Sequence, residues 1–273
     1  MLKLVLKTAA GGAVAIAIAA GLHGTAHALP MLPVQNFSFS AFSGAAPKNN
    51  FSTVNPADWF QGAPNIANLV YVDAPGTATS FTGGYAVVGP FADPPTGGNY
   101  VQADGDPILG RTIEQTITGL TPGQQYTLSF WQAAGQQPGF SGDTTEQWKV
   151  FFGATGVVNM SCPGIGDCTY SSADTEYDSP EMDTPSQGVS LWQPVSLTVT
   201  ATGTTDVLTF LAWGDGGSTA NEPPTVFLAG VDPPALAPEP ATLSLVGIGL
   251  VGLGAALWAR RIRRSRRTKR PSM

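Results

Sequence analysis

Basic residues are scarce in the middle of this 273-residue chain. Of its thirteen Lys and Arg, two lie before residue 8, eight lie after residue 259, and only three lie between residues 29 and 237. That span holds eighteen of the nineteen acids, so its net charge is −15. A surface of this sign repels a phosphate backbone, which excludes nucleic acid as a partner.

Histidine is missing from the same span, because both histidines, His23 and His27, precede it. Without imidazole there is no Ser-His-Asp or Cys-His machinery, no HExxH zinc site and no histidine base. Paired carboxylates remain as the widespread catalytic option.

Cysteine is nearly missing as well. Cys162 and Cys168 are the only two, and they bracket a loop rich in Gly and Pro. In an oxidising compartment this arrangement predicts a small disulfide. The alternative, a metal site, would need further ligands nearby, and the spacing matches no zinc motif.

The N-terminus has the pattern of a secretory signal peptide over residues 1–28. Lys3 and Lys7 precede a short apolar run, and Ala26 and Ala28 form a small-x-small cleavage site. The alternative is an uncleaved N-terminal anchor. Either interpretation predicts export.

The C-terminus has the pattern of a membrane span followed by a basic tail. Residues 241–259 carry no charge, and nineteen helical residues extend roughly 28 Å, about the thickness of the hydrocarbon core. Residues 260–273 hold the cations Arg260, Arg261, Arg263, Arg264, Arg266, Arg267, Lys269 and Arg270. Such a cluster stays in the cytoplasm, so everything before Pro238 is predicted to lie outside.

Pro238, Glu239 and Pro240 stand directly before this span. The order of Pro-Glu-Pro, apolar helix and arginine cluster over residues 238–273 resembles the PEP-CTERM sorting signal of exported bacterial proteins. The resemblance implies an exosortase as a partner, cleavage near Pro-Glu-Pro, and a setting of exopolysaccharide and biofilm. The helix would then be a temporary single-pass anchor in the inner membrane with a cytoplasmic C-terminus.

Residues 29–231 predict an all-β domain, a β-sandwich or jelly roll, followed by a Pro-rich linker at 232–237. Short apolar stretches of period two alternate with turn residues, and thirteen Phe and six Trp suit the inner faces of two sheets. The clearest predicted strands are 194–200, 124–131, 207–213 and 148–152. Weaker ones are 34–42, 69–73, 85–88, 100–102, 112–117 and 225–231. Residues 155–188 lack the pattern and are predicted to form a surface excursion.

Two stretches of this domain, residues 98–106 and 114–130, resemble PEP-CTERM ectodomains with a galactose-binding-like jelly roll. In those relatives a late strand often ends in Leu-Asp-Asn/Gly-Val. Here Ala229 stands where the aspartate would be. The resemblance implies a fold more firmly than a ligand.

An acidic cluster at Asp174, Glu176 and Asp178 alternates oxygen ligands as calcium prefers them, although a solvated acidic loop is the favoured interpretation. The turn at Asp104 and Asp106 is open to three interpretations, a plain tight turn, a structural calcium site, or a carboxylate pair. Calcium is the one cofactor considered.

Trp131 is a candidate sugar contact, because its phase differs from that of the apolar positions around it on a predicted strand. The main hypothesis is an exported, non-enzymatic cell-surface or extracellular-matrix protein associated with exopolysaccharide. The first alternative is a polysaccharide-active enzyme that uses two carboxylates. The second alternative is a permanently anchored envelope protein. The carboxylates considered for the enzyme are Asp104, Asp106, Asp143, Glu146 and Asp215.

Overall fold

The computed structural model describes residues 28–41, 49–50, 54–65, 70–80, 85–109, 111–163, 168–215 and 224–232. The predicted signal peptide apart from Ala28, the linker from residue 233 and the sorting signal at 238–273 lie outside the described residues. Within those ranges, no helix is long and apolar enough to cross a membrane.

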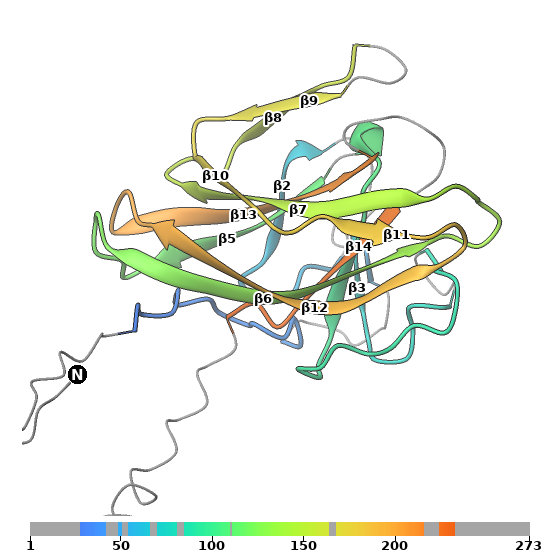
Figure 1. Ribbon diagram of the computed structural model, residues 1–273. Helices are drawn as coiled ribbons and strands as arrows, with labels where there is room; N and C mark the ends of the chain where they lie inside the picture. Colours follow the sequence, from blue (N-terminus) through green and yellow to red (C-terminus); the bar gives the residue numbers. More distant parts are fainter. Residues whose placement is uncertain are drawn as a thin grey trace, which may run out of the picture.

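Two antiparallel sheets pack face to face as a β-sandwich, which confirms the predicted all-β class (Figure 1). The first sheet has the order β1 (Asn49–Asn50), β3 (Val70–Asp73), β4 (Tyr100–Asp104), β14 (Pro224–Ala229), β6 (Gln125–Gln136) and β12 (Val189–Thr200). The second has the order β10 (Thr175–Asp178), β7 (Thr144–Gly153), β13 (Thr205–Gly214), β5 (Arg111–Thr118) and β2 (Phe60–Asn65), with β11 (Met182–Thr184) also paired to β7.

The core lies between the sheets and is built from alternate strand positions. Leu128 and Phe130 of β6 face Trp148 and Phe210 of the second sheet, and all four are buried. The Phe130 and Phe210 rings meet edge to face at 5.2 Å, and those of Trp148 and Phe210 at 5.9 Å. Burial of each such side chain stabilises the fold by roughly 1.5–3 kcal/mol.

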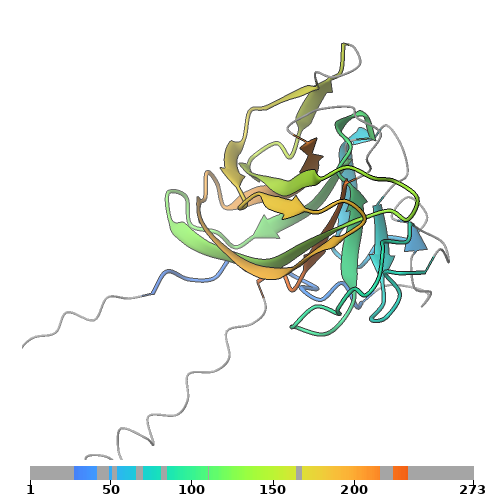
Figure 2. The same cartoon turned by 45° about the vertical axis from the view of Figure 1, so that its right-hand side comes forward.

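A hairpin of β8 (Val158–Ser161) and β9 (Thr169–Ser172) covers part of the outer face of the second sheet (Figure 2). The disulfide between Cys162 and Cys168 joins its two strands and confirms the predicted pairing. Val158 and Cys168 pack there against Phe151 and Trp213 of the sheet. The bond therefore fastens a small second core.

Both ends of the described domain are tied to β6. Thr127 N donates to Pro30 O at 2.8 Å, and Leu32 N donates to Thr127 O at 2.9 Å. Asp232 N donates to Ser129 O at 2.6 Å, and Ser129 N donates to Asp232 Oδ1 at 2.7 Å. The two ends thus leave the sandwich from neighbouring positions on one strand.

Three strand predictions were wrong. Residues 34–41 form turns, because Asn36 and Phe39 adopt positive φ angles of 47° and 51°, and residues 85–88 form no strand. Residues 155–188, predicted as a surface excursion without strands, contain β8, β9, β10 and β11. A one-turn 3-10 helix, Pro107–Leu109, follows β4.

Candidate ligand-binding site

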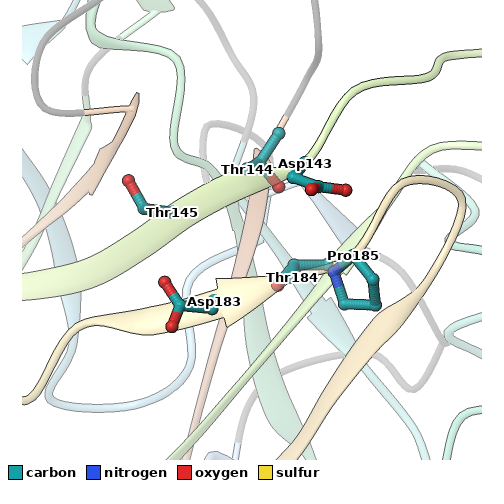
Figure 3. Close-up of a pocket in the computed structure, with 6 residues that line it drawn as sticks. All are labelled: Asp143, Thr144, Thr145, Asp183, Thr184 and Pro185. Carbon is teal, nitrogen blue, oxygen red and sulfur yellow. The ribbon is translucent and has the colours of Figure 1, made fainter.

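A pocket of about 420 Å³ opens where β7 begins and β11 ends. Asp143, Thr144 and Thr145 form one wall, and Asp183, Thr184 and Pro185 form the other (Figure 3). The walls meet because Thr184 pairs with Thr144, and Asp183 with Thr145, in the antiparallel register. Each wall therefore carries one carboxylate, Asp143 or Asp183, on a lining that is otherwise mostly apolar.

Glu146 lies behind this pocket on the inner face of β7 and is fully buried. Its Oε1 is hydrogen-bonded to Thr144 Oγ1, and its Oε2 is hydrogen-bonded to Thr184 Oγ1 at 2.7 Å. Burial is the main cause that raises the pKa of Glu146 to about 7; the hydrogen bonds with Thr144 and Thr184 act against it, and the charges of Asp215 and Asp183 add to it. Glu146 thus joins the two walls from within.

The rim of the pocket is held by further carboxylates and amides. Asp143 Oδ1 accepts from Ser186 N at 2.8 Å, and Asp215 Oδ1 accepts from Thr145 N at 3.0 Å. The side chain of Gln136 fixes the turn after β11, because Gln187 N donates to Gln136 Oε1 at 2.6 Å. Nothing in the local sequence around Gln136 indicates this role.

Of the five carboxylates considered for catalysis, the structure gathers Asp143, Glu146 and Asp215 at this pocket. Asp104 and Asp106 do not line it. Asp104 lies buried on the outer face of the first sheet, and its Oδ1 accepts from Asp106 N at 2.8 Å. Burial raises the pKa of Asp104 to about 7 and also raises that of Asp106.

Trp131 lies on the outer face of the first sheet and is half-buried. It packs against a cluster that includes Tyr100, Phe227 and Trp192. Phe91 covers this cluster with its ring 4.4 Å from that of Phe227, and Trp192 Nε1 donates to Ala92 O at 2.7 Å. Sugar contact by Trp131 stays a prediction, with a partly exposed aromatic surface around it.

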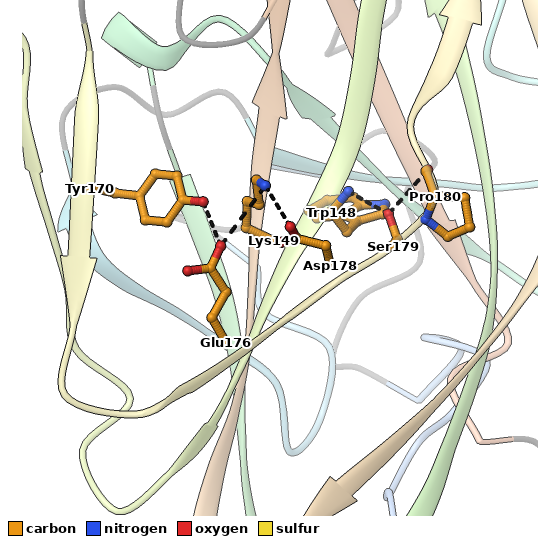
Figure 4. A network of polar contacts seen from close by, with 7 residues as sticks. All are labelled: Trp148, Lys149, Tyr170, Glu176, Asp178, Ser179 and Pro180. Carbon is orange, nitrogen blue, oxygen red and sulfur yellow. Dashed lines mark hydrogen bonds and ion pairs between the residues drawn. The ribbon is translucent and has the colours of Figure 1, made fainter.

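The acidic cluster predicted for calcium has protein partners (Figure 4). Lys149 Nζ lies 3.0 Å from Asp178 Oδ2 and 3.9 Å from Glu176 Oε1, and Tyr170 donates to Glu176. Asp174 accepts from Gly156 N at 2.6 Å. In the described part of the chain, no three acidic, histidine or cysteine side chains form a group suited to a metal ion.

Burial and the neighbouring Glu176 raise the pKa of the Tyr170 hydroxyl. The Tyr170 ring also lies 5.8 Å from Lys149 Nζ, so the cation is flanked by carboxylates and an aromatic face. Since these groups satisfy one another, calcium binding here stays a prediction without a preformed site.

No protein-family model matches the chain. No curated protein matches it. Solved structures that resemble it include three with sequence identities of 12–13%.

The first is the enzymatically active domain of tailspike protein 4 of bacteriophage CBA120, with 12% identity and a TM-score of 0.35 over 70% of this chain and 21% of that one. The chain thus spans about a fifth of that domain. The second is TmCBM61 in complex with β-1,4-galactotriose, with 13% identity and a TM-score of 0.32 over 68% of this chain and 97% of that one. The third is the K1 cleaved adhesin domain of Lys-gingipain from Porphyromonas gingivalis W83, with 13% identity and a TM-score of 0.34 over 69% of this chain and 96% of that one. At these scores the likenesses carry no argument about function, and the sandwich is established by the strand pairing of this chain.

Proposed function

We propose that the chain is an exported, non-enzymatic surface or matrix protein whose β-sandwich binds polysaccharide at the pocket between β7 and β11. The observation that carries the proposal is the lining of this pocket. Asp143 and Asp183 supply carboxylate acceptors, and Thr145 supplies a hydroxyl beside them. Sugar hydroxyls donate to carboxylates in charge-assisted hydrogen bonds, which are stronger than neutral ones.

The charge of the domain selects a neutral sugar over an anionic one. Residues 29–237 carry a net charge of −15, and both exposed carboxylates of the pocket add to the local negative potential. Lys149, the cation whose side chain is described, is engaged with Glu176 and Asp178. An acidic polymer would be repelled from this opening, whereas neutral hexoses would not.

Binding is tested with the full chain, purified in detergent, on a panel of neutral and acidic oligosaccharides. Asp183→Asn preserves size and removes one ionised acceptor, so the affinity for a bound neutral glycan is expected to fall about tenfold. Glu181→Gln is the matched control, because Glu181 is exposed two residues away and does not line the pocket. Equal losses in both variants, or no binding by any neutral glycan, would exclude the pocket as the site.

The enzymatic alternative has one specific difficulty. Glu146, whose pKa is raised to about 7, is fully buried behind the pocket and already bonded to Thr144 and Thr184 through both oxygens. A general acid must reach the proton acceptor on the substrate. Catalysis would therefore fall to Asp143 and Asp183, and release of reducing ends that disappears in Asp183→Asn would establish it.

We propose that an exosortase processes the chain near Pro238. The support comes from the sequence over residues 238–273, and the last described residue before it, Asp232, is bonded to Ser129 on β6. Gln136, beside the pocket, lies seven residues further along β6, roughly 23 Å away. Asp232 is therefore distant from the pocket along β6. Mass spectrometry of the mature chain tests this processing. A C-terminus near Pro238 is expected, and a C-terminus at Met273 would mean a permanent anchor.

A further inference from the structure

A chain of oxygen atoms runs through the back wall of the pocket. Glu146 Oε2 lies 2.7 Å from Thr184 Oγ1, and Thr184 Oγ1 lies 3.1 Å from Ser190 Oγ. Ser190 Oγ in turn lies 2.7 Å from the carbonyl oxygen of Asp183. At the other end, Glu146 Oε1 contacts Thr144 Oγ1. Four contacts therefore connect β7, β11 and β12.

The number of protons available to this row of oxygen atoms depends on whether Glu146 is protonated. Each contact between two oxygens needs one proton to be a hydrogen bond. Thr144, Thr184 and Ser190 supply one each, and the carbonyl of Asp183 supplies none. The fourth proton has to come from the carboxyl of Glu146. With an ionised carboxylate, one contact would set lone pairs against each other.

We propose that Glu146 is a positioning residue, held as a carboxylic acid, which completes this chain and fixes the β11 wall of the pocket. The proposal rests on the proposed function only for the claim that a ligand uses this wall. In the neutral state, Glu146 donates to Thr184, Thr184 donates to Ser190, and Ser190 donates to the Asp183 carbonyl. Thr144 donates to the other carboxyl oxygen.

The surroundings of Glu146 favour the neutral state. Burial raises its pKa to about 7 and outweighs the hydrogen bonds with Thr144 and Thr184, which lower it. The charged groups around it are acids, namely Asp183 on β11, Asp215 after β13 and Asp143 before β7. On the remaining neighbouring elements, β13 pairs Gly214 with Glu146, β12 presents Ser190, and the inner face of β6 presents Gln132 and Gln136. Lys149 lies on the opposite face of β7, bonded to Glu176 and Asp178.

Loss of the proton above about pH 7 adds a negative charge beside Asp183 and removes one hydrogen bond. The wall depends on β11, which has only three residues, Met182–Thr184. We therefore expect the protection of its amides, and the affinity of a ligand held by Asp183, to fall about fivefold, the equivalent of one net hydrogen bond.

Two variants distinguish a neutral Glu146 carboxylic acid from an ionised Glu146 carboxylate. In Glu146→Gln the amide nitrogen can donate to Thr184 while the amide oxygen accepts from Thr144, so this variant reproduces the acid at every pH. Ser190→Ala removes the middle of the chain and leaves the bonds of Glu146 to both threonines.

The direct test is a carbon-13 titration of glutamate carboxyls in the full chain in detergent, where the signal missing from Glu146→Gln identifies the residue. The expected midpoint is about 7, and a midpoint near the ordinary value of 4.5 overturns the proposal. The second test is hydrogen exchange over residues 182–188, expressed as protection factors, at about pH 6 and about pH 8.

In the exchange test, the wild type is expected to lose about fivefold protection at the higher pH, and Glu146→Gln to keep the lower-pH level at both. If Glu146→Gln instead loses as much protection as Ser190→Ala at the lower pH, an ionised carboxylate holds the wall and the proposal is wrong. Neither measurement needs a ligand. A glycan panel without binding would refute the proposed function and leave these results unaffected.

Discussion

Raising the pH from about 5 to about 8 is expected to destabilise the folded domain, because four buried carboxyls hold protons in it. They are Asp104, Glu114, Glu146 and Asp232, and burial raises the pKa of each to about 7. Their ordinary values are 3.8 for aspartate and 4.5 for glutamate. Between those values and about 7, the folded state binds more protons than the unfolded state. The free energy of unfolding therefore falls as the pH rises.

The magnitude follows from the width of this window. Each extra proton gives a slope of about 1.4 kcal/mol per pH unit. For Glu146, the interval from 4.5 to about 7 corresponds to roughly 3 kcal/mol, fully present below about pH 4.5 and lost as the pH rises through about 7. Since a domain is commonly stable by about 5–15 kcal/mol, even one of the four groups gives a measurable effect.

The assay is urea unfolding of the full chain in detergent, followed by tryptophan fluorescence at several pH values between about 5 and about 8. Glu146→Gln keeps the side-chain size and cannot titrate, so its slope is expected to be smaller by up to about 1.4 kcal/mol per pH unit. Glu181→Gln, at an exposed position, should leave the slope unchanged. A free energy of unfolding that stays constant or rises over this range would refute the reasoning.

Three further predictions concern the core, the hairpin and calcium. Phe210→Ala should lower the free energy of unfolding in urea by about 3–5 kcal/mol, because the fully buried Phe210 ring contacts Phe130 and Trp148. The control Leu191→Ala, at a side chain 78% exposed, should change it by no more than about 0.5 kcal/mol. Equal effects of the two variants would contradict the packing of Phe210 in the core. Replacing the cysteine pair, which is separated by 6 residues, with serines should cost about 2 kcal/mol, and an unchanged midpoint would show that the hairpin holds without the bond. EGTA should leave the Tm unchanged, since the acidic cluster is already bonded to protein groups, and a Tm raised by added calcium would establish a site.

The strands that the sequence predicts are those with one buried face over many residues. Val195 and Val199 of β12 alternate with exposed neighbours, so period two is visible. The four strands between residues 155 and 188 escape prediction because they are three or four residues long and mostly exposed. β10 and β11 form by pairing with β7, and pairing between distant segments leaves no local pattern.

The candidate site, like the fold, was predictable from the sequence only in part. The sequence indicates three of the acids at this site, since Asp143, which lines the pocket, and Glu146 and Asp215, which lie beside it, are among the carboxylates predicted for sugar chemistry. The sequence does not predict that these acids lie near Asp183, because this depends on the register that places Asp183 beside Thr145. The row of hydrogen-bonded oxygen atoms that needs a proton from Glu146 depends further on side-chain geometry where β11 contacts β12.

Composition and order along the chain by themselves determined the acidic, histidine-free character of the domain, its all-β class and its disulfide, because these follow from counts and local periodicity. The predicted export signal and sorting tail belong to the same local kind of information. Tertiary structure alone decided which acids share a pocket and which lie buried elsewhere. The physical reason is that antiparallel pairing joins residues about forty positions apart, and burial then sets the protonation state of each carboxyl by its surroundings.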